Sequence, residues 1–208
     1  MTRVRVKICG ITRVEDAITA ARYGADAIGL VFYKDSPRYV DTGTAKNIAL
    51  ALPPFVSKVG LFVDASKDEI DEILSEVPLD ILQFHGNETP EQCNEYTIHY
   101  IKAVRMQNGI NLNEITSRYS EAVALLLDSY VEGKQGGTGK SFDWSIIPDN
   151  TAKPVILAGG LTPDNVADAI QQVSPYAVDV SGGVESAKGI KDENKIAAFI
   201  QEVNNAQA

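Results

Sequence analysis

Two side chains in this sequence have the chemistry of a proton-transfer pair, and they are Cys9 and Asp128. Cys9 lies in the segment Lys7-Ile-Cys-Gly-Ile-Thr12, where a strand-like run turns into a helix-like pattern. A cation or a helix N-terminus near that turn would favour the thiolate, which is the form that can act as a base. Asp128 follows the apolar run Leu125–Leu127, so partial burial would favour the protonated carboxyl that an acid needs.

Each of the two residues also has a purely structural interpretation. A buried cysteine such as Cys9 commonly behaves as a small apolar side chain. An aspartate at the end of a strand, such as Asp128, can cap the loop that follows it. The sequence therefore predicts an acid–base pair only if both residues reach the same site.

Paired glycines end two strand-like runs near the C-terminus, at Gly159–Gly160 and Gly182–Gly183. Glycine lets a ligand oxygen approach backbone N–H groups that a Cβ atom would block. Such groups can bind phosphate without a cationic side chain. Tight strand-to-helix turns are the alternative for either pair alone. Because (β/α)8 barrels frequently build a phosphate site from the loops after strands seven and eight, the two pairs together predict such a site.

A third glycine-rich segment, Lys134–Ser141, resembles the nucleotide-binding P-loop but does not match it. The P-loop pattern requires a glycine five residues before Gly139, and this chain has Lys134 there. The segment also begins several residues beyond the strand-like run that precedes it. We expect a loop over the catalytic mouth that folds over substrate and excludes water, with a flexible surface turn as the alternative.

The elements that must position these residues follow from a repeated pattern of strand-like and helix-like segments. Most of the strand-like runs are continuously apolar, as is typical of parallel strands buried on both faces. The pattern is compatible with a closed (β/α)8 TIM barrel or with an open doubly wound sheet. The number of runs and the position of the glycines favour one barrel of eight parallel strands over residues 1–208. The runs are Val4–Ile8, Ala27–Phe32, Val59–Val63, Ile81–Phe84, Ile101–Val104, Val123–Leu127, Val155–Leu157 and Ala177–Val180.

Helix signals fill the intervals between these runs. Capping boxes are predicted to begin at Thr12, Ser66 and Thr89. In a capping box, a hydroxyl and a carboxyl or amide three residues later accept hydrogen bonds from free backbone N–H groups. Pro90 and Pro163 fit first helical turns. A short helix is expected within residues 141–147. Apolar residues share one face in three segments: Ile70, Ile73, Leu74 and Val77; Val166, Ala169, Ile170 and Val173; Ile196, Phe199, Ile200 and Val203.

Composition excludes several classes of protein. The net charge of −9 argues against a nucleic-acid partner, because that affinity depends on phosphate neutralisation by Lys and Arg. No run approaches the roughly 20 apolar residues of a membrane helix, and no signal peptide is recognised, so we expect a cytoplasmic protein without membrane contact. Two distant cysteines, of which Cys93 is read as a packing residue, and two histidines predict neither a disulfide framework nor a metal centre.

The ordered set of short motifs resembles the phosphoribosylanthranilate isomerase family over nearly the whole chain, from Val4 to about Phe199. Any one motif is weak, but their order is specific, and no departure occurs at a catalytic position. The motifs are Lys7-Ile-Cys-Gly-Ile-Thr12, Ser36-Pro-Arg-Tyr39, Val59-Gly-Leu-Phe-Val63, Leu82-Gln-Phe-His-Gly86, Leu127-Asp-Ser129, Gly136-Gly-Thr-Gly139, Leu157-Ala-Gly-Gly-Leu161 and Asp179-Val-Ser-Gly-Gly-Val-Glu185.

The resemblance implies a role for each candidate residue. Cys9 would be the general base and Asp128 the general acid of an Amadori rearrangement in tryptophan biosynthesis. Arg38 would contact the anthranilate carboxylate and Asp179 the ribose hydroxyls, while His85 would position substrate or fill the barrel mouth. Phosphate would be held by backbone groups of five residues, namely Gly159, Gly160, Ser181, Gly182 and Gly183. Neither a metal nor an organic cofactor is implied, and the partner is a small phosphorylated substrate.

Other phosphate-binding barrels fit the sequence less well. An indole-glycerol-phosphate synthase is expected to carry catalytic lysine and glutamate residues and an N-terminal extension, which are not evident here. A histidine-pathway isomerase is expected to have aspartates where this chain has Cys9 and Arg105. A non-catalytic phosphosugar-binding barrel stays open as a different class, because fold alone does not establish activity. The ordinary polarity of the helix faces leads us to expect a monomer.

Overall fold

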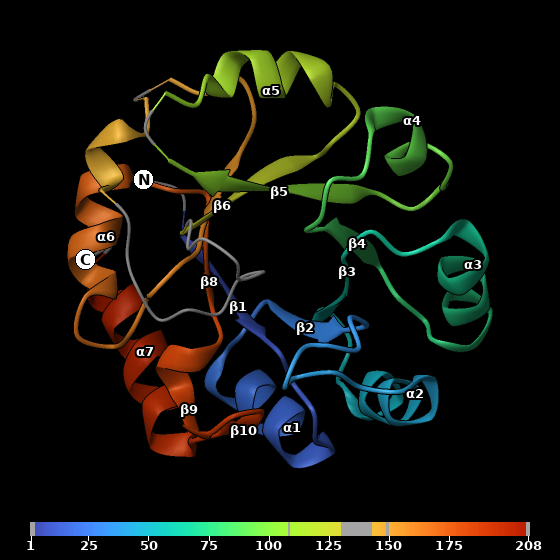
Figure 1. The fold of residues 1–208 in the computed structure, drawn as a ribbon. Coiled ribbons are helices and arrows are strands. Elements are labelled where there is room, and N and C mark those ends of the chain that lie inside the picture. Colours follow the sequence, from blue (N-terminus) through green and yellow to red (C-terminus); the bar gives the residue numbers. More distant parts are fainter. Residues whose placement is uncertain (1–2, 108, 130–142, 149, 207–208) are drawn as a thin grey trace.

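Eight parallel strands form a closed barrel in which each strand pairs with the next and the last pairs with the first (Figure 1). The structure is a computed structural model that describes residues 3–107, 109–129, 143–148 and 150–206. The strands are β1 (Arg5–Cys9), β2 (Ala27–Val31), β3 (Ser57–Phe62), β4 (Ile81–Phe84), β5 (Tyr100–Met106), β6 (Ala124–Ser129), β7 (Val155–Leu157) and β8 (Ala177–Val180). All eight predicted runs form strands, so the predicted TIM barrel is confirmed.

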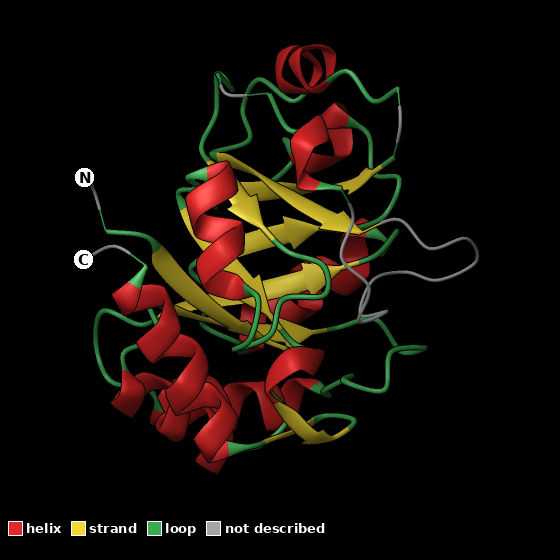
Figure 2. Ribbon diagram, turned by 90° about the vertical axis from the view of Figure 1, so that its left-hand side faces the viewer, coloured by secondary structure: helices red, strands yellow, loops and turns green. Residues whose placement is uncertain are grey.

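Helices surround the barrel on its outside, as the side view in Figure 2 shows. They are α1 (Val14–Tyr23), α2 (Thr42–Ala51), α3 (Lys67–Glu76), α4 (Pro90–Cys93), α5 (Leu112–Arg118), α6 (Val166–Val173) and α7 (Glu193–Asn205). Two 3-10 turns, η1 (Trp144–Ile146) and η2 (Gly182–Val184), and a small antiparallel pair, β9 (Glu185–Ala187) with β10 (Ile190–Lys191), complete the described elements. The helix expected within residues 141–147 is thus a 3-10 turn in its described part.

The helix signals are confirmed at α3 and α4 and wrong at α1 and α6. Ser66 and Thr89 cap their helices through the predicted reciprocal hydrogen bonds, and Pro90 occupies the first turn of α4. Thr12 is not a cap, because α1 begins one residue later than predicted and the Thr12 hydroxyl donates to the Gly189 carbonyl at 2.5 Å instead. Pro163 lies before α6, in a turn that the Asn165 side chain closes by accepting from the Thr162 amide.

Alternation along the strands divides the side chains between an outer apolar layer and the barrel interior. The outer layer packs the predicted helix faces against the strands; all four residues predicted for the last helix are buried. In the interior, small and branched side chains of β5 and β6, including Ile101, Ala103 and Leu126, form one cluster. The same alternation places Asp128 on the inner face of β6, two residues beyond Leu126.

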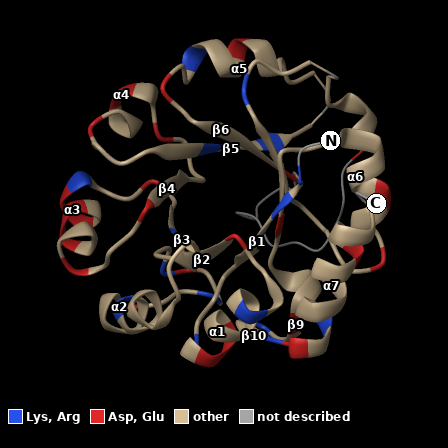
Figure 3. Ribbon diagram, turned by 180° about the vertical axis from the view of Figure 1, so that it is seen from behind, with Lys and Arg blue, Asp and Glu red and all other residues tan. Residues whose placement is uncertain are grey.

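Charged residues lie mainly on the outer helices, and basic residues also occur on β1 and β5 (Figure 3). Within the described residues, no helix combines the length and the apolar character that crossing a membrane requires.

Candidate active site

One cavity collects every candidate residue at the carboxyl ends of the strands. It has a volume of about 630 Å³. The sequence-predicted residues that line it are Cys9, Arg38, His85, Asp128, Gly159, Gly160, Asp179, Ser181, Gly182 and Gly183. Residues from both halves of the chain therefore meet in a single pocket, as the barrel closure between β8 and β1 requires.

Asp128 lies on one side of this cavity and is held by two hydrogen-bonding neighbours. The Nε2 atom of His85 lies 3.2 Å from Asp128 Oδ2, and the Ser129 amide donates to Oδ1 at 2.8 Å. The Nδ1 atom of the same imidazole lies 3.0 Å from Nε2 of Gln83. If the Gln83 amide donates to Nδ1, the imidazole proton sits on Nε2 and is directed at Asp128. Hydrogen bonds thus link the side chains of Gln83, His85 and Asp128 in that order.

Cys9 lies in the same cavity, among charged groups. The Lys7 ammonium, two residues earlier on the same face of β1, favours the Cys9 thiolate and lies 2.7 Å from Asp179 Oδ1. Burial raises the pKa of the Cys9 thiol above its ordinary value; Lys7 opposes this shift and Asp179 adds to it. The expected cation is present, but the expected net lowering of the pKa is wrong because burial and Asp179 outweigh it.

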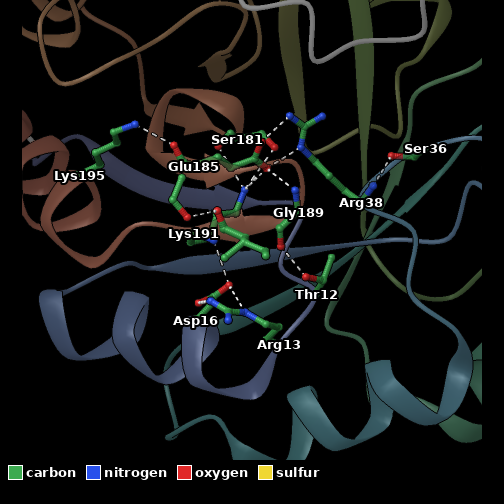
Figure 4. A network of polar contacts seen from close by, with 12 residues as sticks. Thr12, Arg13, Asp16, Ser36, Arg38, Ser181, Glu185, Gly189, Lys191 and Lys195 are labelled. Atoms are coloured by element: carbon green, nitrogen blue, oxygen red, sulfur yellow. Dashed lines mark hydrogen bonds and ion pairs between the residues drawn. The ribbon is translucent and has the colours of Figure 1, made fainter.

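Arg38 reaches the cavity from the connection between β2 and α2 and is bound to Glu185 (Figure 4). Its Nε and Nη2 atoms donate to the two Glu185 oxygens at 2.7 and 2.8 Å. Lys191 donates to the same carboxylate at 3.0 Å and to the Ser181 carbonyl at 3.1 Å. Burial would raise the pKa of Glu185, but the hydrogen bonds from Arg38 and Lys191 hold it below its ordinary value. The carboxylate thus ties Arg38 to the loop after β8.

The two glycine pairs require glycine for different structural reasons, backbone conformation in one pair and close packing in the other. Gly159 and Gly160 have φ of 84° and 67°, a left-handed backbone that side chains rarely adopt. A Cβ atom on Gly183 would collide with the Leu161 carbonyl, so this glycine lets the loops after β7 and β8 come into contact. Lys188, an exposed side chain of the β9–β10 turn, also lines the cavity and adds a cation that the sequence did not single out.

The contacts of the site bring in residues that sequence reasoning missed. Lys7 and Gln83 each stand two residues before a predicted site residue, so the period of a strand could have placed them on the same face. Glu185 and Lys191 carry no such signal, because they lie beyond the last barrel strand, on β9 and β10. The predicted lid segment 134–141 lies outside the described residues.

A thiol, a carboxyl and glycine-rich turns in one cavity define a (β/α)8 barrel with acid–base chemistry at the carboxyl ends of its strands. Such a cavity can remove a proton from one atom of a bound molecule and donate one to another. Within the described residues, no group of three or more His, Cys, Asp or Glu side chains is placed to hold a metal ion.

Comparison with known proteins identifies the family. The model of the N-(5'-phosphoribosyl)anthranilate (PRA) isomerase family matches residues 6–202. The N-(5'-phosphoribosyl)anthranilate isomerase of Pseudomonas fluorescens (strain SBW25) is 61% identical over 206 residues, which is 99% of this chain and 98% of the relative. The chain belongs to the N-(5'-phosphoribosyl)anthranilate isomerase family and is an enzyme of the isomerase class.

Solved structures agree with this assignment. The crystal structure of phosphoribosyl anthranilate isomerase from Thermotoga maritima has a TM-score of 0.89 and 42% identity, and covers 97% of this chain and 99% of that one. A phosphoribosyl anthranilate isomerase solved in complex with reduced 1-(o-carboxyphenylamino)-1-deoxyribulose 5-phosphate has a TM-score of 0.86, 41% identity and the same coverage.

Proposed function

We propose that this protein converts N-(5'-phosphoribosyl)anthranilate to 1-(2-carboxyphenylamino)-1-deoxyribulose 5-phosphate in tryptophan biosynthesis, by an acid–base Amadori rearrangement. The observation that carries the proposal is the presence of Cys9, Asp128 and both glycine turns around one cavity. The ligand of the related complex is a reduced form of the proposed product, which supports the substrate class. A single catalytic domain over residues 1–208 is part of the proposal.

Asp128 is the general acid of the first step. Its carboxyl proton goes to the furanose ring oxygen, the bond from that oxygen to the anomeric carbon breaks, and a Schiff base forms with the anthranilate nitrogen. His85 positions the carboxyl for this transfer, since its Nε2 atom lies 3.2 Å from Asp128 Oδ2. We therefore assign His85 to the acid rather than to direct substrate binding.

Cys9 is the general base of the second step. Its thiolate takes the proton from the sugar carbon next to the Schiff base, and the electron pair of that C–H bond moves to give an enolamine. Tautomerisation of the enolamine yields the ketone. Asp128 loses one proton and Cys9 gains one in each cycle, so exchange through solvent restores the pair. Each transfer contributes about 10²–10⁴-fold to the rate.

Substrate is held by groups around the reacting carbons. Arg38 has two of its nitrogens on Glu185, and within the described residues Nη1 has no such partner, so it is the atom assigned to the anthranilate carboxylate. Asp179 gives one oxygen to Lys7 and uses the other for ribose hydroxyls. Backbone groups of residues 159–160 and 181–183 bind the phosphate, whose remote binding energy orients the sugar.

The test is turnover of the purified protein. Anthranilate fluorescence reports consumption of N-(5'-phosphoribosyl)anthranilate, and the expected result is rapid loss of signal together with growth of a tryptophan auxotroph that lacks this isomerase. Binding of the substrate without turnover would instead indicate a non-catalytic phosphosugar-binding barrel. Turnover of a different phosphosugar alone would move the protein to another barrel enzyme.

Two coarser expectations belong to the same proposal, a cytoplasmic location and a monomeric state. Fractionation of the source cells tests the location. The monomer is open to a specific objection, because Leu50 and Phe55, at the end of α2 and just beyond it, are 67% and 100% exposed. Light scattering after size-exclusion chromatography tests the state, and a dimeric mass would contradict a monomer.

A further inference from the structure

Lys7 is a buried cation directly behind the proposed base. Its side chain is 5% exposed and lies 2.7 Å from Asp179 Oδ1, and its charge favours the Cys9 thiolate. Lys7 does not line the cavity, whereas Cys9 and Asp179 do. It therefore acts through its two neighbours.

The neighbouring strand β2 shows that the side chains of Lys7 and Cys9 lie close to the same position. Gly29 of β2 stands beside Cys9 in the strand register. A Cβ atom on Gly29 would lie 2.7 Å from Cys9 Sγ and 3.1 Å from Lys7 Nζ. Because Gly29 has no side chain, the Lys7 ammonium and the Cys9 thiol can both lie beside it.

Four charged groups act on the Cys9 thiol, and their signs differ. Lys7 from β1 and Lys191 from β10 favour the thiolate, whereas Asp179 from β8 disfavours it. Arg38, from the connection between β2 and α2, also interacts favourably with an anionic Cys9. Glu185 pairs with both Arg38 and Lys191, so its single negative charge offsets part of their positive charge. Among the charged groups, Lys7 and Asp179 have the two largest effects on the thiol.

We propose that Lys7 is a positioning residue for Cys9, an ammonium shared between the thiol and Asp179 that sets how much thiolate the base supplies. Its use in turnover rests on the proposed function, but its effect on the thiol does not. Burial opposes the charge of Lys7, yet the attraction of Asp179 and Cys9 raises the pKa of Lys7 above its ordinary value, so the ammonium persists below pH 10.5.

Thiol alkylation measures this directly, without substrate. In the reaction with iodoacetamide the Cys9 thiolate forms a C–S bond, the C–I bond breaks, and iodide leaves; the thiol proton has already gone to solvent. The rate at a fixed pH follows the thiolate fraction. A Cys93→Ala background removes the second thiol, which is buried in α4 and absent from the cavity.

In that background, Lys7→Met and Asp179→Asn should act in opposite directions. Lys7→Met removes the attractive charge and leaves Asp179 next to the sulfur, so alkylation at pH 8 should slow by at least about tenfold, the change that one pKa unit gives. Asp179→Asn leaves Lys7 uncompensated, so alkylation should accelerate several-fold. Lys7→Arg keeps the charge and should stay closest to the parent rate. Mass spectrometry of the Cys9 peptide gives each rate from pH 6 to 10.

Opposite signs separate this proposal from a structural role for Lys7. Loosening of the fold would expose the thiol and accelerate alkylation in every variant, and equal or same-direction changes in Lys7→Met and Asp179→Asn would overturn the proposal. If Lys7→Met does not fold, Asp179→Asn with Lys7→Arg still decides the matter, because a slower Asp179→Asn contradicts it. Alkylation as expected in a protein without turnover would refute the proposed function alone.

Discussion

The thiol side and the carboxyl side of the cavity differ in what surrounds the proton-transfer group. Cys9 lies near Lys7 of β1 and Asp179 of β8, and both of these residues carry a full charge. The described contacts of Asp128 come from an imidazole and a backbone amide, and the imidazole is in turn bound to the neutral amide of Gln83. One side is organised by ions and the other by a chain of hydrogen bonds.

The difference follows from what each group has to do. A base must become an anion in a buried place, and burial disfavours that anion unless a cation is adjacent. An acid must release its proton along a defined direction, and hydrogen bonds on either side of the carboxyl fix its orientation. The comparison predicts that the thiol side is sensitive to charge, whereas the carboxyl side is sensitive to geometry.

Removing the proton from the carboxyl side should give the largest effect. Asp128→Asn keeps the shape of the side chain and its hydrogen bond from Ser129 but supplies no carboxyl proton. We expect kcat to fall by about 10⁴-fold, the upper end for one proton transfer. Steady-state fluorescence kinetics measure this, with circular dichroism to check the fold. The control is Asp68→Asn, the same change on the exposed first turn of α3, which should keep parental kcat.

Changing the thiol to a hydroxyl should have the second-largest effect. Cys9→Ser nearly keeps the size of the side chain but offers a group that ionises far less readily, so kcat should fall by roughly 10²–10³-fold. The matched change Cys93→Ser, at a buried thiol outside the cavity, should leave kcat within about twofold of the parent. Near-parental turnover of Cys9→Ser would show that Cys9 is not the base, and the comparison between the thiol side and the carboxyl side would no longer apply.

Loss of the imidazole tests whether the carboxyl side depends on geometry. His85→Ala keeps the Asp128 carboxyl but removes its Nε2 contact, so we expect kcat to drop roughly 10- to 10²-fold while KM changes little. His99→Ala, an exposed histidine away from the cavity, is the control. A large rise in KM with unchanged kcat would show that His85 binds substrate directly.

The sequence was sufficient for the fold and for the groups on the strands. Apolar runs, most of them continuous, identified all eight strands, and strand ends brought Cys9, His85 and Asp128 to one mouth. It was insufficient for contacts that residues outside the barrel strands make with distant segments. Thr12 has the pattern of a helix cap, but its hydroxyl donates a hydrogen bond to the carbonyl of Gly189, 177 residues away. Glu185 likewise acquires its role only when Arg38 is folded against it.

The smallest expected effect concerns stability at alkaline pH, and it belongs to the thiol side. Burial raises the pKa of Cys9 in the folded protein above its ordinary value of 9.0. The native state therefore retains a proton that the unfolded state has lost, so the free energy of unfolding should fall as the pH rises above 9.0. Below that pH the contribution is fully present.

Two variants isolate the Cys9 contribution to this alkaline loss. Cys93 and Tyr100, whose pKa values burial raises to about 12, also titrate in this direction. We therefore compare Cys93→Ala with the double variant Cys9→Ser/Cys93→Ala, in which Tyr100 is common and cancels. Urea unfolding at pH 8, 9 and 10 should show the single variant losing about 1 kcal/mol more than the double variant by pH 10, within the limit of about 1.4 kcal/mol per pH unit for one group. If the stability of the two variants has the same pH dependence, the charged groups around Cys9 fully compensate its burial and its pKa is not raised. The two sides of the cavity would then not differ in the protonation of the resting thiol.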